Sequence, residues 1–173
     1  MIKDINNIPK LRKQLGHGGR VKIGVFGENS HMAMVMHVQE FGAIVSQDKE
    51  KTRKAMRYLF AKMKEEGIPI KPKTKNRGKI IIPERAPMRN TFDDRKILEK
   101  IFRDARIIFS LGGNVKQILT AIGEKMVNGI QQTIADGLEP GQHPYTTAAK
   151  GGKNKPLINE GRLRQSIQFE VKL

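Results

Sequence analysis

The sequence predicts an α+β fold, in which a small and mainly antiparallel sheet packs against two or three helices. Apolar and polar residues alternate over residues 163–173, a pattern typical of a strand with one buried face. Apolar residues recur every three or four positions over residues 97–109 and 115–134, which is typical of amphipathic helices. Because 173 residues can bury one sizeable core, we expect a single domain over residues 1–173.

Three segments are expected to form the sheet. Residues 21–26 (VKIGVF) alternate, residues 79–82 (KIII) form a short apolar run that Pro83 ends, and residues 163–173 complete the set. The last segment needs a partner, because a lone strand satisfies neither its backbone nor its apolar face. It either completes the sheet of its own chain or offers an edge to a neighbouring subunit.

Two helices are expected in the first half of the chain. The segment HMAMVMHVQEFG has helical character through Met36 and stops at Gly42, where a glycine permits a turn. Over residues 50–66, apolar and aromatic side chains fall on one helical face, and Gly67 is the expected C-terminal cap. We expect this second helix to pack through its methionine and aromatic side chains.

The two most regular helical patterns lie in the second half. Asn90 or Thr91 is the expected cap of the helix around residues 97–109, and two carboxylates follow the cap at the positive end of the helix dipole. A glycine pair then separates this helix from the one over residues 115–134. We expect both helices to cover one face of the sheet. Residues 138–160 carry Gly, Pro and Lys without periodicity and are expected to form a long loop of a functional or mobile kind.

The charge of the chain points to an acidic or polyanionic partner. Thirty-three basic side chains against 17 acidic ones give a formal charge of +16. Residues 49–79 alone hold twelve basic and three acidic side chains, a net charge of +9. In KPKTKNRGK the basic residues occupy alternate positions, so an extended chain would present them along one side. A solvated arm is the alternative interpretation of this segment.

Ten residues of this segment are the candidate contacts to DNA or to an acidic partner. Few aromatic residues are interleaved with them, and no known base-reading pattern occurs, so contact would be made with the nucleic-acid backbone. The candidates are Lys49, Lys51, Arg53, Lys54, Arg57, Lys71, Lys73, Lys75, Arg77 and Lys79.

The sequence offers little catalytic or metal-binding chemistry. There is no cysteine, the four histidines lack a metal-binding spacing, and no nucleophile elbow or phosphate-binding glycine motif is present. We therefore expect no catalytic, cofactor or metal site. The longest apolar run is the five residues MAMVM, and the first ten residues lack a signal-peptide pattern, so we expect neither a membrane span nor export.

Three segments resemble motifs of one protein family. KPLINEGRLRQSIQFEV (residues 155–171) resembles the C-terminal signature of the tail-completion, or virion-morphogenesis, proteins of tailed bacteriophages. HVQEFGA (residues 37–43) resembles the family's His/Glu-Phe/Tyr-Gly element, and IPERAPMRNTFDD (residues 82–94) resembles its Ile-Pro-x-Arg-Pro-Phe-(Met/Leu)-Arg element. The three segments follow one another in the family's order. Residues 46–78 match nothing in the family and would be a basic insertion.

The resemblance implies a structural, non-enzymatic protein of the neck of a tailed phage virion, assembled in the host cytoplasm. Such a protein would be a subunit of a homo-oligomeric ring around the DNA passage, would help to join tail to head, and would contact connector, neck and tail-terminator proteins, with non-specific contact to packaged DNA. The residues that the motifs mark as structural or interface positions are Glu40, Phe41, Gly42, Pro83, Arg85, Pro87, Arg89, Gly161, Leu163, Ser166 and Ile167.

Physical arguments apply to several of these positions. Pro83 and Pro87 fix φ and lack an amide donor, which favours an extended passage between strand and helix. Arg85 and Arg89 are suited to bonds with carboxylates of a neighbouring subunit, or remain solvated. Two other function classes stay open. Charge alone is compatible with a monomeric DNA- or RNA-binding accessory protein, and scattered His, Asp and Glu residues leave an enzyme such as a nuclease as a third hypothesis.

Overall fold

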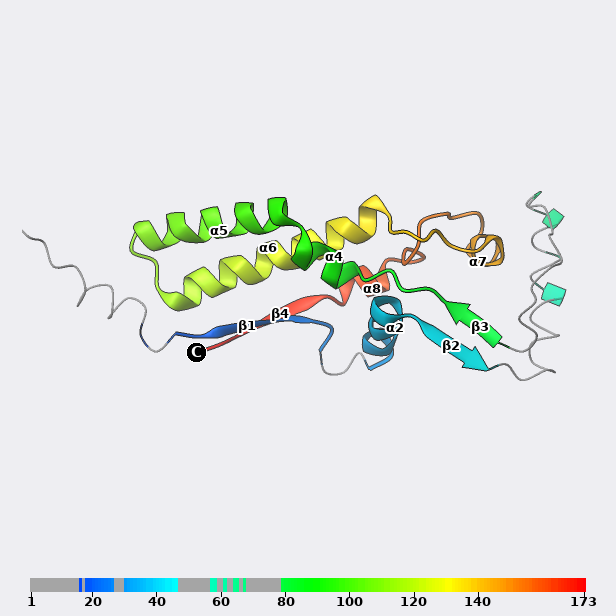
Figure 1. Ribbon diagram of the computed structural model, residues 1–173, viewed down its shortest axis with the longest axis horizontal. Helices are drawn as coiled ribbons and strands as arrows, with labels where there is room; N and C mark the ends of the chain where they lie inside the picture. Colours follow the sequence, from blue (N-terminus) through cyan, green and yellow to red (C-terminus); the bar gives the residue numbers. More distant parts are fainter. Residues whose placement is uncertain are drawn as a thin grey trace, which may run out of the picture.

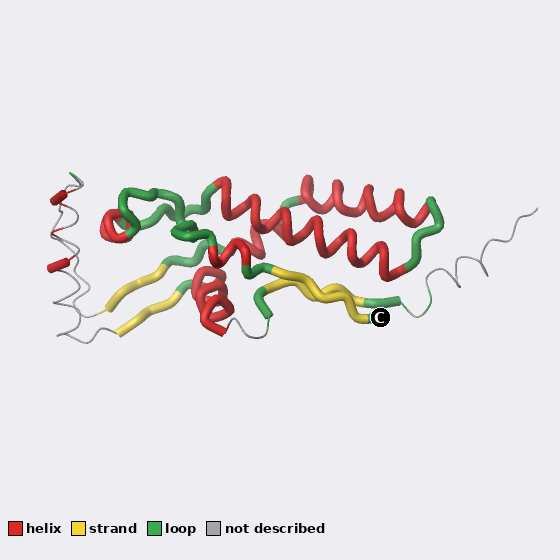
Figure 2. The backbone as a smooth tube through the Cα atoms, turned by 180° about the vertical axis from the view of Figure 1, so that it is seen from behind, coloured by secondary structure: helices red, strands yellow, loops and turns green. Residues whose placement is uncertain are grey.

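The computed structural model describes residues 16, 18–26, 30–46, 57, 58, 61, 64, 65, 67 and 79–173. The α+β class is confirmed, with helices predominating over two antiparallel pairs of short strands (Figures 1 and 2). The helix expected over residues 50–66 lies largely outside the described residues. The elements in chain order are β1 (Arg20–Gly24), α2 (Ser30–Phe41), β2 (Ala43–Ser46), β3 (Lys79–Ile82), α4 (Pro87–Asp93), α5 (Arg95–Ser110), α6 (Val115–Asp136), α7 (Pro144–Ala149), α8 (Arg162–Gln165) and β4 (Gln168–Lys172).

The strands form two separate ribbons. β1 pairs with β4 so that Arg20 lies opposite Lys172, and β2 pairs with β3 so that Ala43 lies opposite Ile82. The expectation of one sheet containing residues 21–26, 79–82 and 163–173 is therefore wrong. β3 pairs instead with β2, which the sequence analysis did not predict and which follows directly on helix α2.

The C-terminal segment changes conformation part of the way along. Only Gln168–Lys172 is a strand, and it completes a sheet of its own chain with β1. The preceding residues form the single turn α8, in which Leu163 is buried. The prediction of a strand from residue 163 is thus wrong for its first part, because a spacing of four between Leu163 and Ile167 suits a helical turn as well as alternation.

Helix α6 is the central layer of the larger half of the molecule. The β1–β4 ribbon packs on one side of α6 and helix α5 packs on the other, as Figure 1 shows. The expectation that both long helices cover the sheet is therefore wrong, because α6 takes that position and α5 packs on α6. Gly123 of α6 provides the close approach to the ribbon, since a Cβ atom there would overlap the ring of Phe169 on β4.

Local polar contacts explain where the two long helices begin. Asp94 caps α5 by accepting hydrogen bonds from the amides of Lys96 and Ile97. Asn114 and Gln117 form a capping box at the start of α6. The predicted caps Asn90 and Thr91 are wrong, because both residues lie within a separate helix, α4, that precedes α5.

The core lies where α2, α6 and α8 meet. The buried apolar cluster there joins one residue of α2, two of α6 and three from the chain after α6: Met36, Ile130, Ile134, Leu138, Leu163 and Ile167. Partly buried residues of β1 and α4, among them Ile23 and Met88, pack against this cluster. The C-terminal motif of the sequence therefore supplies core residues.

The segment of residues 138–160 contains the short helix α7 and contacts made by two lysines. Ala148 of α7 is fully buried. The Lys150 ammonium donates hydrogen bonds to the Gln142 side-chain oxygen and to the carbonyl of Ile158. Burial, and secondarily the charge of Arg85, lowers the pKa of Lys150. Lys155 donates to the carbonyl of Ala135 in α6, which connects the segment to the long helix.

The contact of Gly123 with Phe169 generates a stability prediction. Glycine to alanine in a helix interior normally stabilises by about 0.5–1 kcal/mol, but here we expect Gly123→Ala to lower the free energy of unfolding by about 1–3 kcal/mol, because the new methyl group overlaps the Phe169 ring. Denaturant unfolding measures this. Asn128→Ala, an exposed change in the same helix, is the control, and Phe169→Leu combined with Gly123→Ala should restore part of the loss. A stabilised Gly123→Ala variant would contradict the packing of β4 on α6.

Candidate interface site at the junction of α2 and α4

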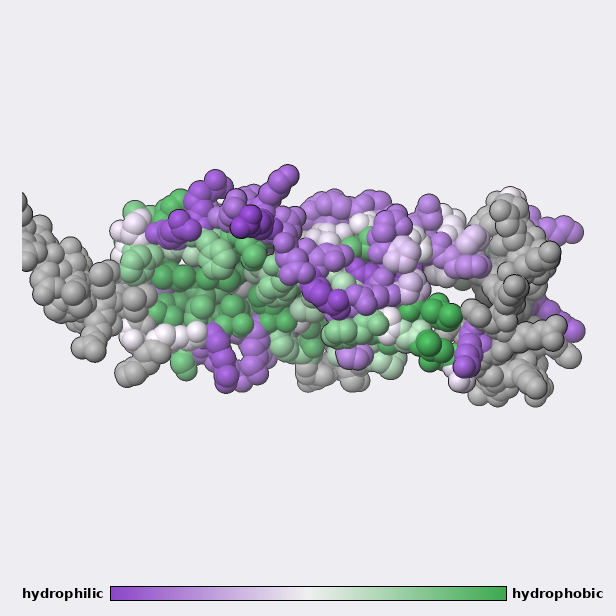
Figure 3. All heavy atoms as spheres, in the orientation of Figure 1, coloured by the Kyte–Doolittle hydropathy of each residue, from purple (hydrophilic) through white to green (hydrophobic). Residues whose placement is uncertain are grey.

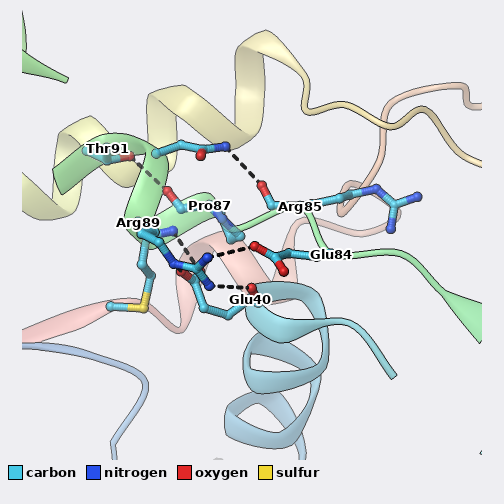
Figure 4. Close-up of polar contacts among 8 residues, drawn as sticks. Glu40, Glu84, Arg85, Pro87, Arg89 and Thr91 are labelled. Atoms are coloured by element: carbon cyan, nitrogen blue, oxygen red, sulfur yellow. Dashed lines mark hydrogen bonds and ion pairs between the residues drawn. The ribbon is translucent and has the colours of Figure 1, made fainter. Parts of the chain in front are cut away.

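Two of the sequence motifs meet where helix α2 ends and helix α4 begins. Glu40, in the last turn of α2, is buried, and its carboxylate accepts hydrogen bonds from the backbone amides of Met88 and Arg89, each at 3.0 Å (Figure 4). These amides belong to the first turn of α4, where no carbonyl of the same helix can serve them. Glu40 therefore caps α4 from another helix.

Residue types at the start of α4 explain why an outside cap is needed. Ala86, the residue before the helix, has no side-chain acceptor and holds a left-handed conformation with φ at +45°. Pro87 occupies the first helical position, where its missing amide leaves no unsatisfied donor. The negative carboxylate of Glu40 also lies at the positive end of the α4 dipole. Sequence alone predicted Pro87 as a passage between strand and helix, and the structure places it at the start of a helix.

Arg89, on helix α4, in turn contacts the end of helix α2. Its Nη2 donates to the backbone carbonyl of Glu40 at 3.0 Å, and its Nη1 donates to Oε1 of Glu84 at 2.7 Å. The guanidinium carbon lies 5.3 Å from the centre of the Phe41 ring. The Glu40 carbonyl is one of the last carbonyls of α2, which lack partners within their helix. Arg89 thus caps the C-terminal end of α2, while Glu40 caps the N-terminal end of α4.

Arg85 binds in the opposite direction, away from the Glu40 carboxylate (Figure 4). Its guanidinium donates to the carbonyls of Pro140 and Gly141 and to the side-chain oxygen of Gln39. Arg85 is buried, and this burial lowers the pKa of its guanidinium against the opposing effect of Glu139. Arg85 therefore connects the segment after α6 to helix α2. The sequence offered Arg85 as solvated or bonded to a neighbouring subunit, and the structure instead gives it acceptors within its own chain.

A second contact holds α4 on its other side. Thr91 is fully buried, and its hydroxyl lies 2.8 Å from the hydroxyl of Thr133 on α6. Thr91 also donates to the carbonyl of Pro87. A Cβ atom at Gly129 would stand 3.2 Å from the methyl group of Thr91, so the glycine permits this close approach. Helix α4 is therefore held between α2 and α6, and we call the contacts of Glu40, Glu84, Arg85 and Arg89 the α2–α4 junction.

Gly42 fixes how the β2–β3 ribbon leaves this junction. It has φ at +71°, a conformation that glycine adopts without strain, directly after helix α2. A Cβ atom there would lie 3.0 Å from the carbonyl oxygen of Ile82 and 3.1 Å from the amide nitrogen of Glu84. Within the Glu-Phe-Gly element, Glu40 therefore caps helix α4, and Gly42 ends helix α2 and turns the chain into β2. Pro83 follows β3 and leads the chain back to the junction.

The motif residues near the C-terminus lie in and around helix α8 and are not part of the α2–α4 junction. Gly161, with φ at +79°, begins α8, and the Ser166 hydroxyl donates to the carbonyl of Leu163. Leu163 and Ile167 are buried in the core cluster beside α2. These four residues contribute to folding, whereas the α2–α4 junction supplies an exposed surface as well.

The exposed part of the junction is apolar and aromatic. Phe41 is 59% exposed, and its ring centre lies 4.8 Å from that of His37. On the adjoining β2–β3 ribbon, Ile44 lies opposite Ile81 on one face, and these side chains are 68% and 55% exposed. Val45 on the other face is exposed too. We call Phe41, Ile44, Val45 and Ile81 the ribbon surface.

A second apolar surface lies at the other end of the described chain. Figure 3 shows hydrophobic residues gathered over α5, α6 and β1 on the face in view, with hydrophilic residues above and below them. Among the large apolar side chains of α5 and its C-terminal end, Phe102, Ile107 and Leu111 are exposed. We call these three residues the α5 surface. A short ribbon and a helix thus each leave large apolar groups in solvent, which monomeric proteins seldom do over extended areas.

Most of the predicted charge site lies outside the described residues. Of the ten basic candidates, Arg57 and Lys79 belong to the described residues, and both are exposed. Lys49, Lys51, Arg53, Lys54, Lys71, Lys73, Lys75 and Arg77 lie outside the described residues. Gln39 and Glu84 were not predicted as parts of the junction. Gln39 has no local signal because its partner Arg85 lies 46 residues away, whereas Glu84 lies only five residues before its partner Arg89.

Within the part of the chain that the structure describes, no three His, Asp or Glu side chains gather as metal ligands. None of the described helices combines the length and apolar character that crossing a membrane requires. No family model, curated protein or solved structure matches this chain.

The capping role of Glu40 generates the second prediction. Glu40→Ala should lower the free energy of unfolding by about 1–3 kcal/mol, because two partly buried amides lose their acceptor. The matched change Glu84→Ala removes only the exposed partner of Arg89 and should cost less than about 1 kcal/mol. Denaturant unfolding of both variants measures the difference. Equal effects would mean that Glu40 acts as a surface charge and does not hold the junction.

Proposed function

We propose that this chain is a structural, non-enzymatic subunit of a tailed bacteriophage virion, of the neck or tail-completion type. It forms part of a homo-oligomeric ring that helps to join tail to head around the DNA passage. Its other contacts in the virion are with connector, neck and tail-terminator proteins. The ring is assembled in the host cytoplasm before the virion is complete.

One observation carries the ring proposal, namely the two separate apolar surfaces on one elongated molecule. The ribbon surface and the α5 surface lie near opposite ends of the described chain (Figure 1). A protein that uses two different patches on its own surface associates head to tail, and such contacts close into rings when the rotation between neighbours permits. A two-stranded ribbon alone is marginally stable, so contact with a neighbour would also stabilise β2 and β3.

The three resembling motifs support the phage assignment in a second way. Two of them, around Glu40 and around Arg89, form one junction through direct hydrogen bonds, although 49 residues separate these positions. The third, around Leu163, packs in the core beside α2. Two of the segments that were recognised separately in the sequence therefore meet in one junction beside the β2–β3 ribbon, and the third packs against the same helix α2.

The rival function is that of a monomeric DNA- or RNA-binding accessory protein. The net charge of +16 supports nucleic-acid contact for either function. The exposed apolar side chains favour the ring, because a monomer would leave Ile44, Ile81 and Phe102 in solvent permanently. The two functions therefore differ in a measurable property, the oligomeric state.

Analytical ultracentrifugation tests the proposal. We expect the full chain to form a discrete oligomer, and we expect Ile44→Lys with Ile81→Lys, or Phe102→Glu alone, to shift it towards monomer without loss of helical circular dichroism. Phe92→Glu is the matched control, because Phe92 is an exposed aromatic residue of α4 outside both surfaces. A wild-type chain that stays monomeric at high concentration would contradict the ring and favour the accessory protein.

A further inference from the structure

The outward side of helix α5 carries a line of basic side chains that the sequence analysis left unassigned. Lys96, Lys100, Arg103 and Arg106 are exposed and follow one another at steps of four, three and three residues. These steps keep the four side chains on one face of a helix. Together with Glu99 they line one open hollow of the surface. We call these four cations the α5 basic stripe.

The four side chains of the stripe are exposed to solvent because the opposite side of α5 makes the packing contacts. Ile101 and Ala105, on that opposite side, are buried, and α5 packs on α6 there. Figure 3 shows hydrophilic residues along the upper edge of the molecule, where α5 lies. A ligand can therefore approach the stripe without disturbing the core.

The stripe keeps a net positive charge beside the acidic residues of the helix. Asp104 bonds Lys125 of α6 at 2.7 Å, so its charge is directed to the neighbouring helix, and it approaches Arg103 only to 4.0 Å. The pKa of Asp104 is lowered, first by the hydrogen bond from Lys125 and further by the charges of Arg103 and Lys100. Glu99 is the one carboxylate among the residues that line the hollow.

We propose that the α5 basic stripe binds the phosphate backbone of a nucleic acid without reading its sequence. From Lys96 to Arg106 the helix rises about 15 Å, which corresponds to roughly four phosphates along one strand of a duplex. The two arginines offer planar forks that fit phosphate oxygens. The residues that line the hollow are all charged, and the apolar or aromatic anchors that a protein partner would require are not among them.

This binding site is distinct from the basic segment of residues 49–79 and does not rest on the ring proposal. The exposed face of the β1–β4 ribbon provides a natural comparison. It carries Arg20, Lys22 and Lys172, but Lys22 lies directly opposite Glu170 in the ribbon, which weakens the field on that face. The ribbon face therefore offers three removable positive charges, enough to match a variant of the stripe that loses three, and has a lower expected affinity for phosphates.

Fluorescence anisotropy with a labelled duplex DNA tests the inference on the full chain. The stripe variant combines Lys100→Gln, Arg103→Gln and Arg106→Gln, and the control combines Arg20→Gln, Lys22→Gln and Lys172→Gln. Both lose three exposed charges, so both should unfold at nearly the wild-type temperature. We expect the stripe variant to lower the slope of log affinity against log salt by about 2–3, since each lost phosphate contact removes about 0.9. The control should change this slope by less than about one contact.

Additional probes compare DNA with RNA as the source of phosphates, and distinguish both from an acidic protein. Two unrelated DNA duplexes should bind equally, and a duplex RNA of the same sequence should also bind, because the stripe contacts phosphates and reads no base. Unequal binding of the two DNA duplexes would contradict the inference. Equal slopes for the stripe variant and the control would overturn the inference. So would an unchanged DNA affinity accompanied by lost binding of poly-glutamate, because that result would assign the stripe to an acidic protein. Oligomeric state is measured on the same variants, so failure of the ring and failure of this site are distinguishable.

Discussion

Two charged side chains, Glu40 and Arg89, bind the ends of each other's helices. The carboxylate of Glu40 serves the first amides of α4, and the guanidinium of Arg89 serves a last carbonyl of α2. Each group meets the helix end whose partial charge is opposite to its own, so the helix dipoles add to the hydrogen bonds. Because Gly42 leads directly from α2 into β2, this exchange also fixes where the β2–β3 ribbon points.

The described surface exposes both apolar and basic side chains. The ribbon surface is apolar, the β1–β4 ribbon carries lysine and arginine on its exposed face, and helix α5 exposes both kinds of side chain. Ile107 of the α5 surface lies four residues after Arg103 and so on the same side of the helix as the basic stripe. The proposed ring and the proposed phosphate site therefore share helix α5, and a subunit that buries the α5 surface against a neighbour places the stripe beside that contact.

Elements with a local sequence pattern were predicted correctly. Elements and contacts that depend on segments far apart in the sequence were not predicted. Helices α5 and α6 were predicted because their apolar residues keep a helical spacing over several turns. β2 was missed because its four residues follow a helix directly and its partner β3 begins 33 residues after β2 ends. α8 was mistaken for a strand because Leu163 and Ile167 fit both periods. Glu40, Arg85 and Arg89 were identified through motif resemblance, but the hydrogen bonds of Arg85 to Gln39 and of Arg89 to Glu40 span more than 45 residues and have no local signal.

Hydrogen exchange at the amides of Met88 and Arg89 tests the reciprocal capping most directly. Amides in the first turn of a helix ordinarily exchange quickly, because they lack a partner within the helix. The account predicts that these two amides are protected nearly as well as the amide of Ile130 in the core, and that Glu40→Ala removes the protection while Ile130 keeps it. Rapid exchange of both amides in the wild-type protein, with Ile130 protected, would contradict it.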